Sequence, residues 1–203
     1  MIQMIRWIPL LLAMIHGPML LADEPVEPRE SSSKLLKQPE LPKLTPKQQQ
    51  EVQHWVRELQ RQRTTNRTRA EKQLNRYGSA AVPYLIPVAR SRFDLARIAA
   101  LRVLLKSPRY EASAAALEGL KAENRWVRKL SWQLIEKISG VRSSFPWEDE
   151  DRSRARHNKA RIWERWVQEQ ERLRKLEEQR LREQEASCES TEKPGTPEPE
   201  AGR

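Results

Sequence analysis

The side chains best suited to acid–base or metal chemistry are few and far apart in this sequence. The histidines are His16, His54 and His157, and the one cysteine is Cys188. Metal-binding and catalytic histidines or cysteines recur in short motifs such as HExxH or CxxC, and phosphate loops need clustered glycines. None of these motifs occurs here. The sequence therefore predicts no catalytic residue, no metal site and no cofactor, and we expect a protein that is not an enzyme.

Two further features have weak chemical potential. The acidic run Glu148-Asp149-Glu150-Asp151 lacks the glycine and the ligand spacing of an EF-hand. Because it precedes a predicted helix, we interpret it as electrostatic support for that helix start. Cys188 has no partner within the chain, so it is either a free thiol or one half of an intermolecular disulfide.

An internal repeat marks the elements that must position any functional surface. One pattern, arginine followed by a small and then an aliphatic residue, spans Arg67 to Leu74, Arg97 to Leu104 and Arg128 to Ile135. A residue that can cap a helix precedes each copy, and these residues stand 30 apart, at Thr64, Asp94 and Asn124. A repeat of this length indicates stacked helical units that bury their apolar faces against one another.

Other residues set the limits of the predicted helices. Thr45-Pro46 is typical of a helix start, with a cap followed by proline in the first turn. Gly78 and Gly140 each stand where a helix should end. Pro108 separates two predicted helices, because the residue before proline avoids the helical conformation.

These residues resemble the HEAT-repeat superfamily, in particular its short HEAT-like repeats. The residues that fall in the order used by such repeats are Arg67, Ala70, Leu74, Gly78, Ala81, Pro83, Leu85, Asp94, Arg97, Ala100 and Leu104. The resemblance implies an all-α fold, a short HEAT-like α-solenoid over residues 44–146. It also implies that polar ladder residues join successive repeats, at Asp94, Arg97, Asn124 and Arg128.

A strongly charged helix with two tryptophans follows the repeats. It looks like the end of exported bacterial HEAT-like proteins. Trp163 and Trp166 are three residues apart and so share one helical face. We expect them to cap the exposed end of the stack, with a partner anchor as the alternative. Leu173, Leu176 and Leu181 form a seam too short for a coiled coil, so residues 147–186 are predicted to be a cap and a solvated charged extension.

The ends of the chain have different compositions from the repeats. Residues 1–22 combine Arg6, an apolar run and a small residue before Asp23, which is typical of a secretory signal peptide. The run is too short to span a bilayer, so no membrane span is expected in the mature chain. Residues 23–43 and 187–203 are rich in proline, glutamate and serine and are predicted to be a disordered linker and a disordered tail.

Positive charge is concentrated in the repeats. Residues 43–142 hold 21 basic and 8 acidic side chains, whereas residues 147–186 hold 11 of each. Six of the basic residues stand near predicted turns at one edge of the stack and could form a positive ridge: Arg61, Arg63, Arg90, Arg92, Lys121 and Arg125. Such a ridge attracts anionic partners, which include acidic proteins, anionic polymers and membrane head groups. Export argues against nucleic acid as the partner.

The function predicted from these features is that of an exported, periplasmic or secreted, scaffold or adaptor that binds a protein partner. An accessory subunit of one dedicated envelope complex is the alternative. An anionic polymer-binding protein and an enzyme resembling HEAT-like lyases remain further alternatives, because a fold does not determine chemistry.

Overall fold

The structure, a computed structural model, describes residues 34–148 and 153–191, with the side chains of residues 188–191 left out. Within this part of the chain all regular structure is helical, as the repeat predicted. The predicted signal peptide, residues 23–33 of the predicted linker and residues 192–203 of the predicted tail lie outside the described residues.

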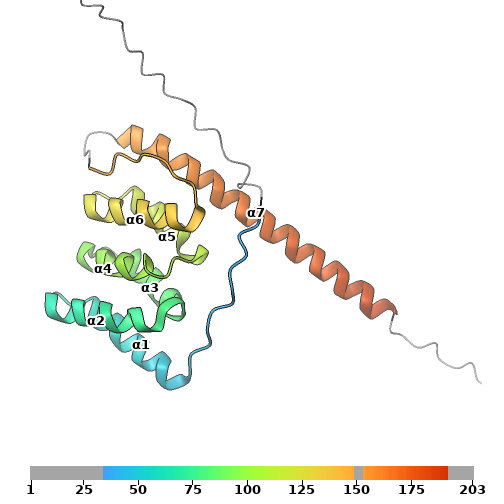
Figure 1. Ribbon diagram of the computed structural model, residues 1–203, viewed down its shortest axis with the longest axis horizontal. Helices are drawn as coiled ribbons and strands as arrows, with labels where there is room; N and C mark the ends of the chain where they lie inside the picture. The colour runs from blue at the N-terminus through green and yellow to red at the C-terminus, as the bar shows by residue number, and fades with distance from the viewer. Residues whose placement is uncertain (1–33, 149–152, 192–203) are drawn as a thin grey trace, which may run out of the picture.

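Three helix pairs are stacked in chain order (Figure 1). Their bounds are α1 Pro46–Leu59, α2 Thr64–Tyr77, α3 Val82–Ala89, α4 Asp94–Leu104, α5 Ser113–Leu120 and α6 Arg125–Ser139. Two short 3-10 turns, η2 Gly78–Ala81 and η3 Tyr110–Ala112, lead into α3 and α5. Helix α4 packs between α2 and α6, while α3 packs between α1 and α5, so the pairs form two helical layers.

Helix starts follow from local capping. Thr45 accepts a hydrogen bond from the Gln48 N–H, and its own N–H donates to the Gln48 side chain at 2.9 Å, which completes a capping box before α1. Asn124 caps α6 by accepting from the Trp126 N–H at 2.9 Å. Gly140 ends α6 in the left-handed conformation, with φ of 71°.

The other two predicted caps have different roles. Thr64 and Asp94 are the first residues of α2 and α4, and their side chains make no capping bond. The Thr64 hydroxyl instead accepts from Arg67 at 3.2 Å, and the Asp94 carboxylate accepts from the Asn124 amide at 3.0 Å. Side-chain donors have therefore replaced the backbone donors of a cap, from the same helix at Thr64 and from the next helix pair at Asp94.

Small residues allow the paired helices to approach closely. Alanines at 96, 99, 100, 112, 115 and 116 are all buried in the core. A close contact joins α5 to α6, where a Cβ atom added to Gly119 would lie 1.9 Å from the Ser131 hydroxyl oxygen. Ser131, which stands in place of the alanine of the repeat pattern, is itself completely buried. Larger side chains at either position would force the two helices apart.

A long helix, α7 Ser153–Thr191, crosses the last pair diagonally and continues beyond it (Figure 1). Its first half packs on α5 and α6 through Ala160, Trp163 and Trp166. Its second half carries the exposed leucines Leu176 and Leu181 among charged residues. The helix continues to Thr191, past the predicted start of the tail at residue 187.

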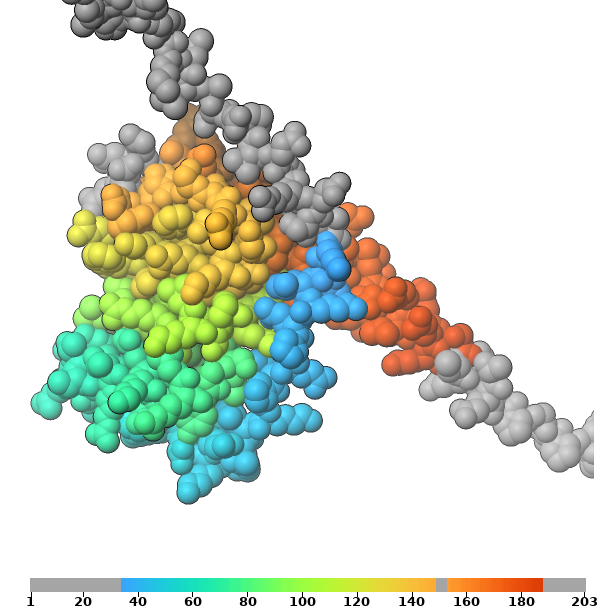
Figure 2. All heavy atoms as spheres, in the orientation of Figure 1, coloured from blue at the N-terminus to red at the C-terminus, as the bar shows by residue number. Residues whose placement is uncertain are grey.

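Residues 34–44, which we call the strap, contradict the flexible linker predicted for residues 23–43. They run in extended form along the side of the stack from α1 to α7 (Figures 1 and 2). The Leu36 N–H donates to the Gln170 side-chain oxygen at 2.7 Å, and the Gln170 amide donates to the Lys34 carbonyl at 3.0 Å. Gln170 is completely buried, so these bonds form in a protected site.

A second group of contacts holds the middle of the strap. Arg109 donates to the Pro39 carbonyl at 2.6 Å, and the Tyr110 N–H donates to the Gln38 side chain at 2.9 Å. Glu111 accepts from Arg109 at 3.0 Å. Burial acts to raise the pKa of Glu111 and is the largest single effect. The hydrogen bonds from Arg109 and from the Glu111 backbone, together with the charges of Arg109 and Arg174, outweigh burial, so the pKa lies below its ordinary value of 4.5.

The strap has a sequence signal that composition alone obscures. Four of its eleven residues are leucines, at positions 35, 36, 41 and 44, and all four are half-buried. Pro39 and Pro42 favour the extended backbone that the strap adopts. The proline and charge content suggested disorder, whereas the leucines supply the apolar surface that repays ordering.

No described helix is both long and apolar enough to cross a lipid bilayer.

Candidate binding site at the turn edge

The turns within the three helix pairs lie along one edge of the stack, which we call the turn edge. They are residues 60–63, 90–93 and 121–124, and they lie at the left in Figure 1. The second and third turns are joined through adjoining helix ends, since Arg90 binds Glu118 of α5 at 2.7 Å and Asn124 binds Asp94, the first residue of α4, at 3.0 Å. The six residues of the predicted ridge all lie in these turns or beside them.

Half of the ridge is engaged in ion pairs. Arg61 binds Glu58 at 2.8 Å, and Lys121 binds Glu164 of α7 at 3.0 Å, in addition to the Arg90–Glu118 pair. These pairs are exposed on at least one side and reduce the positive field without removing it.

Three ridge residues remain open to a partner. Arg63 and Arg92 are exposed and form no ion pair with any residue that the structure describes. Arg125 is exposed and its guanidinium lies 5.4 Å from the centre of the Trp126 ring. The positive charge of the turn edge is therefore concentrated at these three side chains.

The predicted ladder residues divide into two groups. Asp94 and Asn124 join the starts of α4 and α6, as inter-repeat partners would. Arg97 instead donates to the Ala89 carbonyl at 3.2 Å, within its own helix pair. Arg128 donates to the Ala122 carbonyl at 3.0 Å and also to the Trp147 carbonyl at 2.9 Å, beyond the end of α6.

The repeated arginine therefore closes the turn that precedes it, which differs from the inter-repeat role expected for Arg97 and Arg128. Arg67 makes the same kind of contact in the first pair, where it donates to the carbonyls of Arg61 and Gln62. Carbonyls at a helix end lack partners within the helix, and a buried guanidinium supplies several donors at once. The arginine spacing thus follows from the shape of the turn.

Sequence analysis missed the apolar members of the turn edge. Phe93 is 70% exposed, Leu95 is 57% exposed and Trp126 is 47% exposed. Phe93 and Leu95 flank Asp94, and Trp126 follows Asn124 by two residues, so these side chains stand at the adjoining starts of α4 and α6, which the Asp94–Asn124 hydrogen bond joins. Their sequence signal is the presence of large apolar residues at helix starts, where the repeat pattern expects polar ones.

A second tryptophan extends this apolar surface. The rings of Trp126 and Trp147 are 6.0 Å apart, with an angle of 35° between their planes. The Lys129 ammonium lies 4.3 Å from the centre of the Trp147 ring and 5.4 Å from that of Trp126. Aromatic faces attract cations, so both rings contribute to the position of Lys129.

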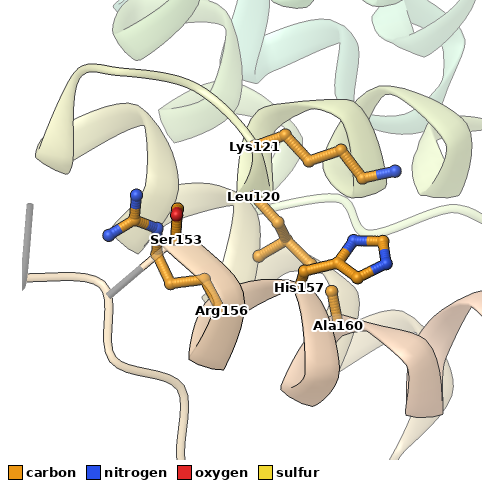
Figure 3. A pocket seen from close by; sticks show the side chains of 6 residues that line it. All are labelled: Leu120, Lys121, Ser153, Arg156, His157 and Ala160. Carbon is orange, nitrogen blue, oxygen red and sulfur yellow. The ribbon is translucent and has the colours of Figure 1, made fainter. Parts of the chain in front are cut away.

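A small pocket adjoins the turn edge where α5 ends and α7 begins (Figure 3). Its volume is about 210 Å³, and its lining is Leu120, Lys121, Ser153, Arg156, His157 and Ala160. The lining is basic, so the pocket continues the positive edge. His157 is exposed here, whereas His54 lies on α1 with its ring centre 4.9 Å from that of Trp55, so the two imidazoles belong to different elements.

The predicted cap residues lie inside the molecule. Trp163 is completely buried and donates from its ring nitrogen to the Val141 carbonyl at 3.0 Å. Trp166 is 6% exposed, with its ring centre 6.0 Å from that of Tyr110. Neither ring has the exposed face that a partner anchor needs. Both cover the last helix pair.

Within the described part of the chain, no three histidine, cysteine, aspartate or glutamate side chains gather as they do around a metal ion. Comparisons with known proteins found no matching family model, curated protein or solved structure.

Proposed function

We propose that the chain is an exported, non-catalytic scaffold or adaptor that binds a protein partner through the turn edge of a short HEAT-like α-solenoid. The observation that carries the proposal is the gathering of open cations and exposed large apolar side chains at this edge. Arg92, Phe93 and Trp126 illustrate the combination. Arginine and tryptophan are enriched among residues that dominate binding energy at protein interfaces.

The solenoid interpretation is supported by three features of the stack. Three helix pairs follow one another in chain order, and equivalent helices pack side by side. Asp94 and Asn124, thirty residues apart, link successive pairs through side chains at equivalent positions. α7 covers the last pair with buried tryptophans, as a terminal cap does in a repeat protein.

A charge-removal experiment tests the turn edge as the binding surface. Arg61, Arg63, Arg90 and Arg92 are replaced together by Gln, and an envelope fraction from the source cell is passed over immobilised wild type and variant at low and high salt. We expect the variant to recover less of a stoichiometric partner, with a weaker dependence on salt. The matched control replaces Arg154, Arg161, Arg165 and Lys175, which are exposed on α7. Equal partner recovery by variant and wild type would refute the turn edge as the surface.

An accessory subunit of one envelope complex is the second candidate, and α7 favours it. The second half of this helix projects beyond the helix pairs with Leu176 half exposed. If the second half of α7 also binds the complex, the chain contacts it both at the turn edge and along α7. Truncation after Gln170 distinguishes the two functions, because an adaptor acting through the turn edge would keep its partner and the accessory subunit would lose its complex.

Export is a separate part of the proposal and rests on the composition of residues 1–22. Expression of the full chain in a cell with a secretion pathway, followed by fractionation and amino-terminal sequencing, tests it. A mature start near Asp23 in the exported fraction is the expected result. An unprocessed chain that stays inside the cell would refute export.

A further inference from the structure

We propose that the partner presents an acidic segment carrying a large apolar side chain, and that this segment binds the part of the turn edge around Trp126. This inference deepens the proposed function and rests on it. We call the surface the Trp126 patch. Its apolar members are Phe93, Leu95, Trp126 and Trp147. Its cations are Arg92, Arg125 and Lys129.

The apolar members are unusual for a surface that faces water. Phe93, Leu95 and Trp126 are three of the five large apolar residues that are exposed in the described part of the chain, and the other two are on the projecting half of α7. Contiguous exposed apolar groups rimmed by polar residues mark interaction sites. The stack itself gains nothing from exposing them at the starts of α4 and α6.

The cations make the patch selective for negative charge. Lys129 and Arg125 both lie near the Trp126 ring, at 5.4 Å from its centre in each case. A ring flanked by two cations offers a carboxylate two nearby partners and offers an apolar side chain a flat surface. Arg92 adds a third positive charge on the adjacent turn.

Besides Asp94, which is half-buried and accepts a hydrogen bond from Asn124, two exposed acidic side chains near the patch weaken its positive field. Glu123 is exposed in the third turn, and exposed Glu148 follows Trp147. Both repel an acidic segment, so their removal should strengthen its binding. Removal of these acids should therefore raise the affinity for the segment, whereas removal of the cations should lower it.

The combination favours a protein segment over an anionic polymer. A polysaccharide or polyphosphate would satisfy the arginines and leave the apolar side chains in water. An acidic segment with one large apolar residue uses both kinds of group. Electrostatic attraction then accelerates association, while the buried apolar contact slows dissociation.

Three fluorescein-labelled peptides test the proposal with the full chain by fluorescence anisotropy. One combines aspartate and glutamate with central phenylalanine and leucine. The second has serine in place of both apolar residues, and the third has asparagine and glutamine in place of the acids. We expect the first to bind more tightly than either of the others by about tenfold or more, which is about 1.4 kcal/mol. Equal binding of the first two, or equal competition by polyphosphate, would show recognition of charge alone and overturn the proposal.

Variants locate the site on the chain. Trp126→Ala and Lys129→Gln should each weaken binding of the first peptide severalfold, and Glu148→Gln should strengthen it. Leu181→Ala is the matched control, because Leu181 is 48% exposed on α7, away from the turn edge. Circular dichroism verifies that each variant is folded, and Phe93→Ser replaces Trp126→Ala if that variant unfolds. Unchanged affinity in folded Phe93→Ser and Lys129→Gln would overturn the location.

The two levels of the proposal fail separately. If the four-arginine variant loses the partner, but no peptide binds wild type more tightly than it binds the Trp126 patch variants, the turn edge binds a partner of another chemical kind. Only this inference is then refuted. If the partner is retained by that variant and the peptides do not bind, the proposed function falls with it.

Discussion

At the scale of single residues, Gly119 and Ser131 form a close contact between α5 and α6. The two helices meet there because glycine contributes no Cβ atom, and an added one would collide with both side-chain atoms of Ser131, at 1.9 Å and 2.8 Å. The Ser131 hydroxyl is also buried without a hydrogen-bond partner among the described residues. The serine therefore contributes its small size to the contact and gains nothing from its polarity.

Substitutions at this contact should have unequal effects. Gly119→Ala should destabilise the fold by about 1–3 kcal/mol, because α5 and α6 must separate to admit the methyl group. Ser131→Ala should change stability by less than about 1 kcal/mol, since it removes an unsatisfied hydroxyl. Urea unfolding followed by circular dichroism measures both. A Gly119→Ala variant as stable as wild type would mean that the helices are further apart than described.

A second prediction at this scale concerns Glu111. Its pKa is lowered in the folded state, so its ionised form stabilises the fold above the ordinary value of 4.5, and this contribution is lost as the pH falls through the folded value. Glu111→Gln should therefore be less stable than wild type at pH 7 and equal to it near pH 3. Urea midpoints measured across this range provide the test. A constant difference at all pH values would mean that the carboxylate charge is not the cause.

At the scale of elements, the helix pairs depend on leucines at repeated positions. Leu104 is completely buried near the end of α4, whereas Leu181 is half exposed on α7. Leu104→Ala should destabilise the fold by about 2–5 kcal/mol, because its neighbours fill the cavity only in part. Leu181→Ala should have almost no effect. Thermal unfolding of both variants gives the comparison, and equal melting temperatures would exclude Leu104 from the core.

The strap gives another prediction at this scale. Gln170→Ala removes both hydrogen bonds that hold residues 34–36, so the strap should detach from α7 while the helices remain folded. Trypsin should then cut faster after Lys37, which is exposed. Gln168→Ala is the control, since Gln168 is exposed on the same helix. Identical cleavage rates for all three proteins would show that Gln170 does not retain the strap.

The helical elements could be predicted better than their contacts. Periodic leucines, proline positions and Gly140 located most helices, because these signals act within a few residues. The side-chain partners of Thr64 and Asp94 could not be predicted from capping preferences, since the side chains of Arg67 and Asn124 compete with backbone N–H groups for the same oxygen atoms. Composition predicted a flexible segment where the strap lies. Its order could not be predicted, because its hydrogen bonds come from residues as distant as Gln170.

At the scale of the whole molecule, the positions of the basic residues could be predicted from the sequence, whereas their ion pairs and the exposed apolar residues beside them could not. Counting basic residues near turns located the positive edge, because turns connect helices at fixed intervals. The ion pairs that engage Arg90 and Lys121 come from Glu118 and Glu164, and their partners depend on how the pairs stack. The exposure of Phe93 and Trp126 could not be predicted, because the hydrophobic pattern assigns large apolar residues to the core.

The strap also determines the order in which the structure can be completed. Leu36 and Gln170 are 134 residues apart in the chain, and their contact joins the segment before the first helix pair to the helix after the last. Helix pairs of a repeat protein can form one after another from local contacts, at low cost in loop entropy. Residues 34–36 of the strap cannot bind Gln170 until α7 is in place, although they are synthesised before any of the helices. The contact that joins the segment before the helix pairs to the helix after them therefore forms last, once α7 has been synthesised.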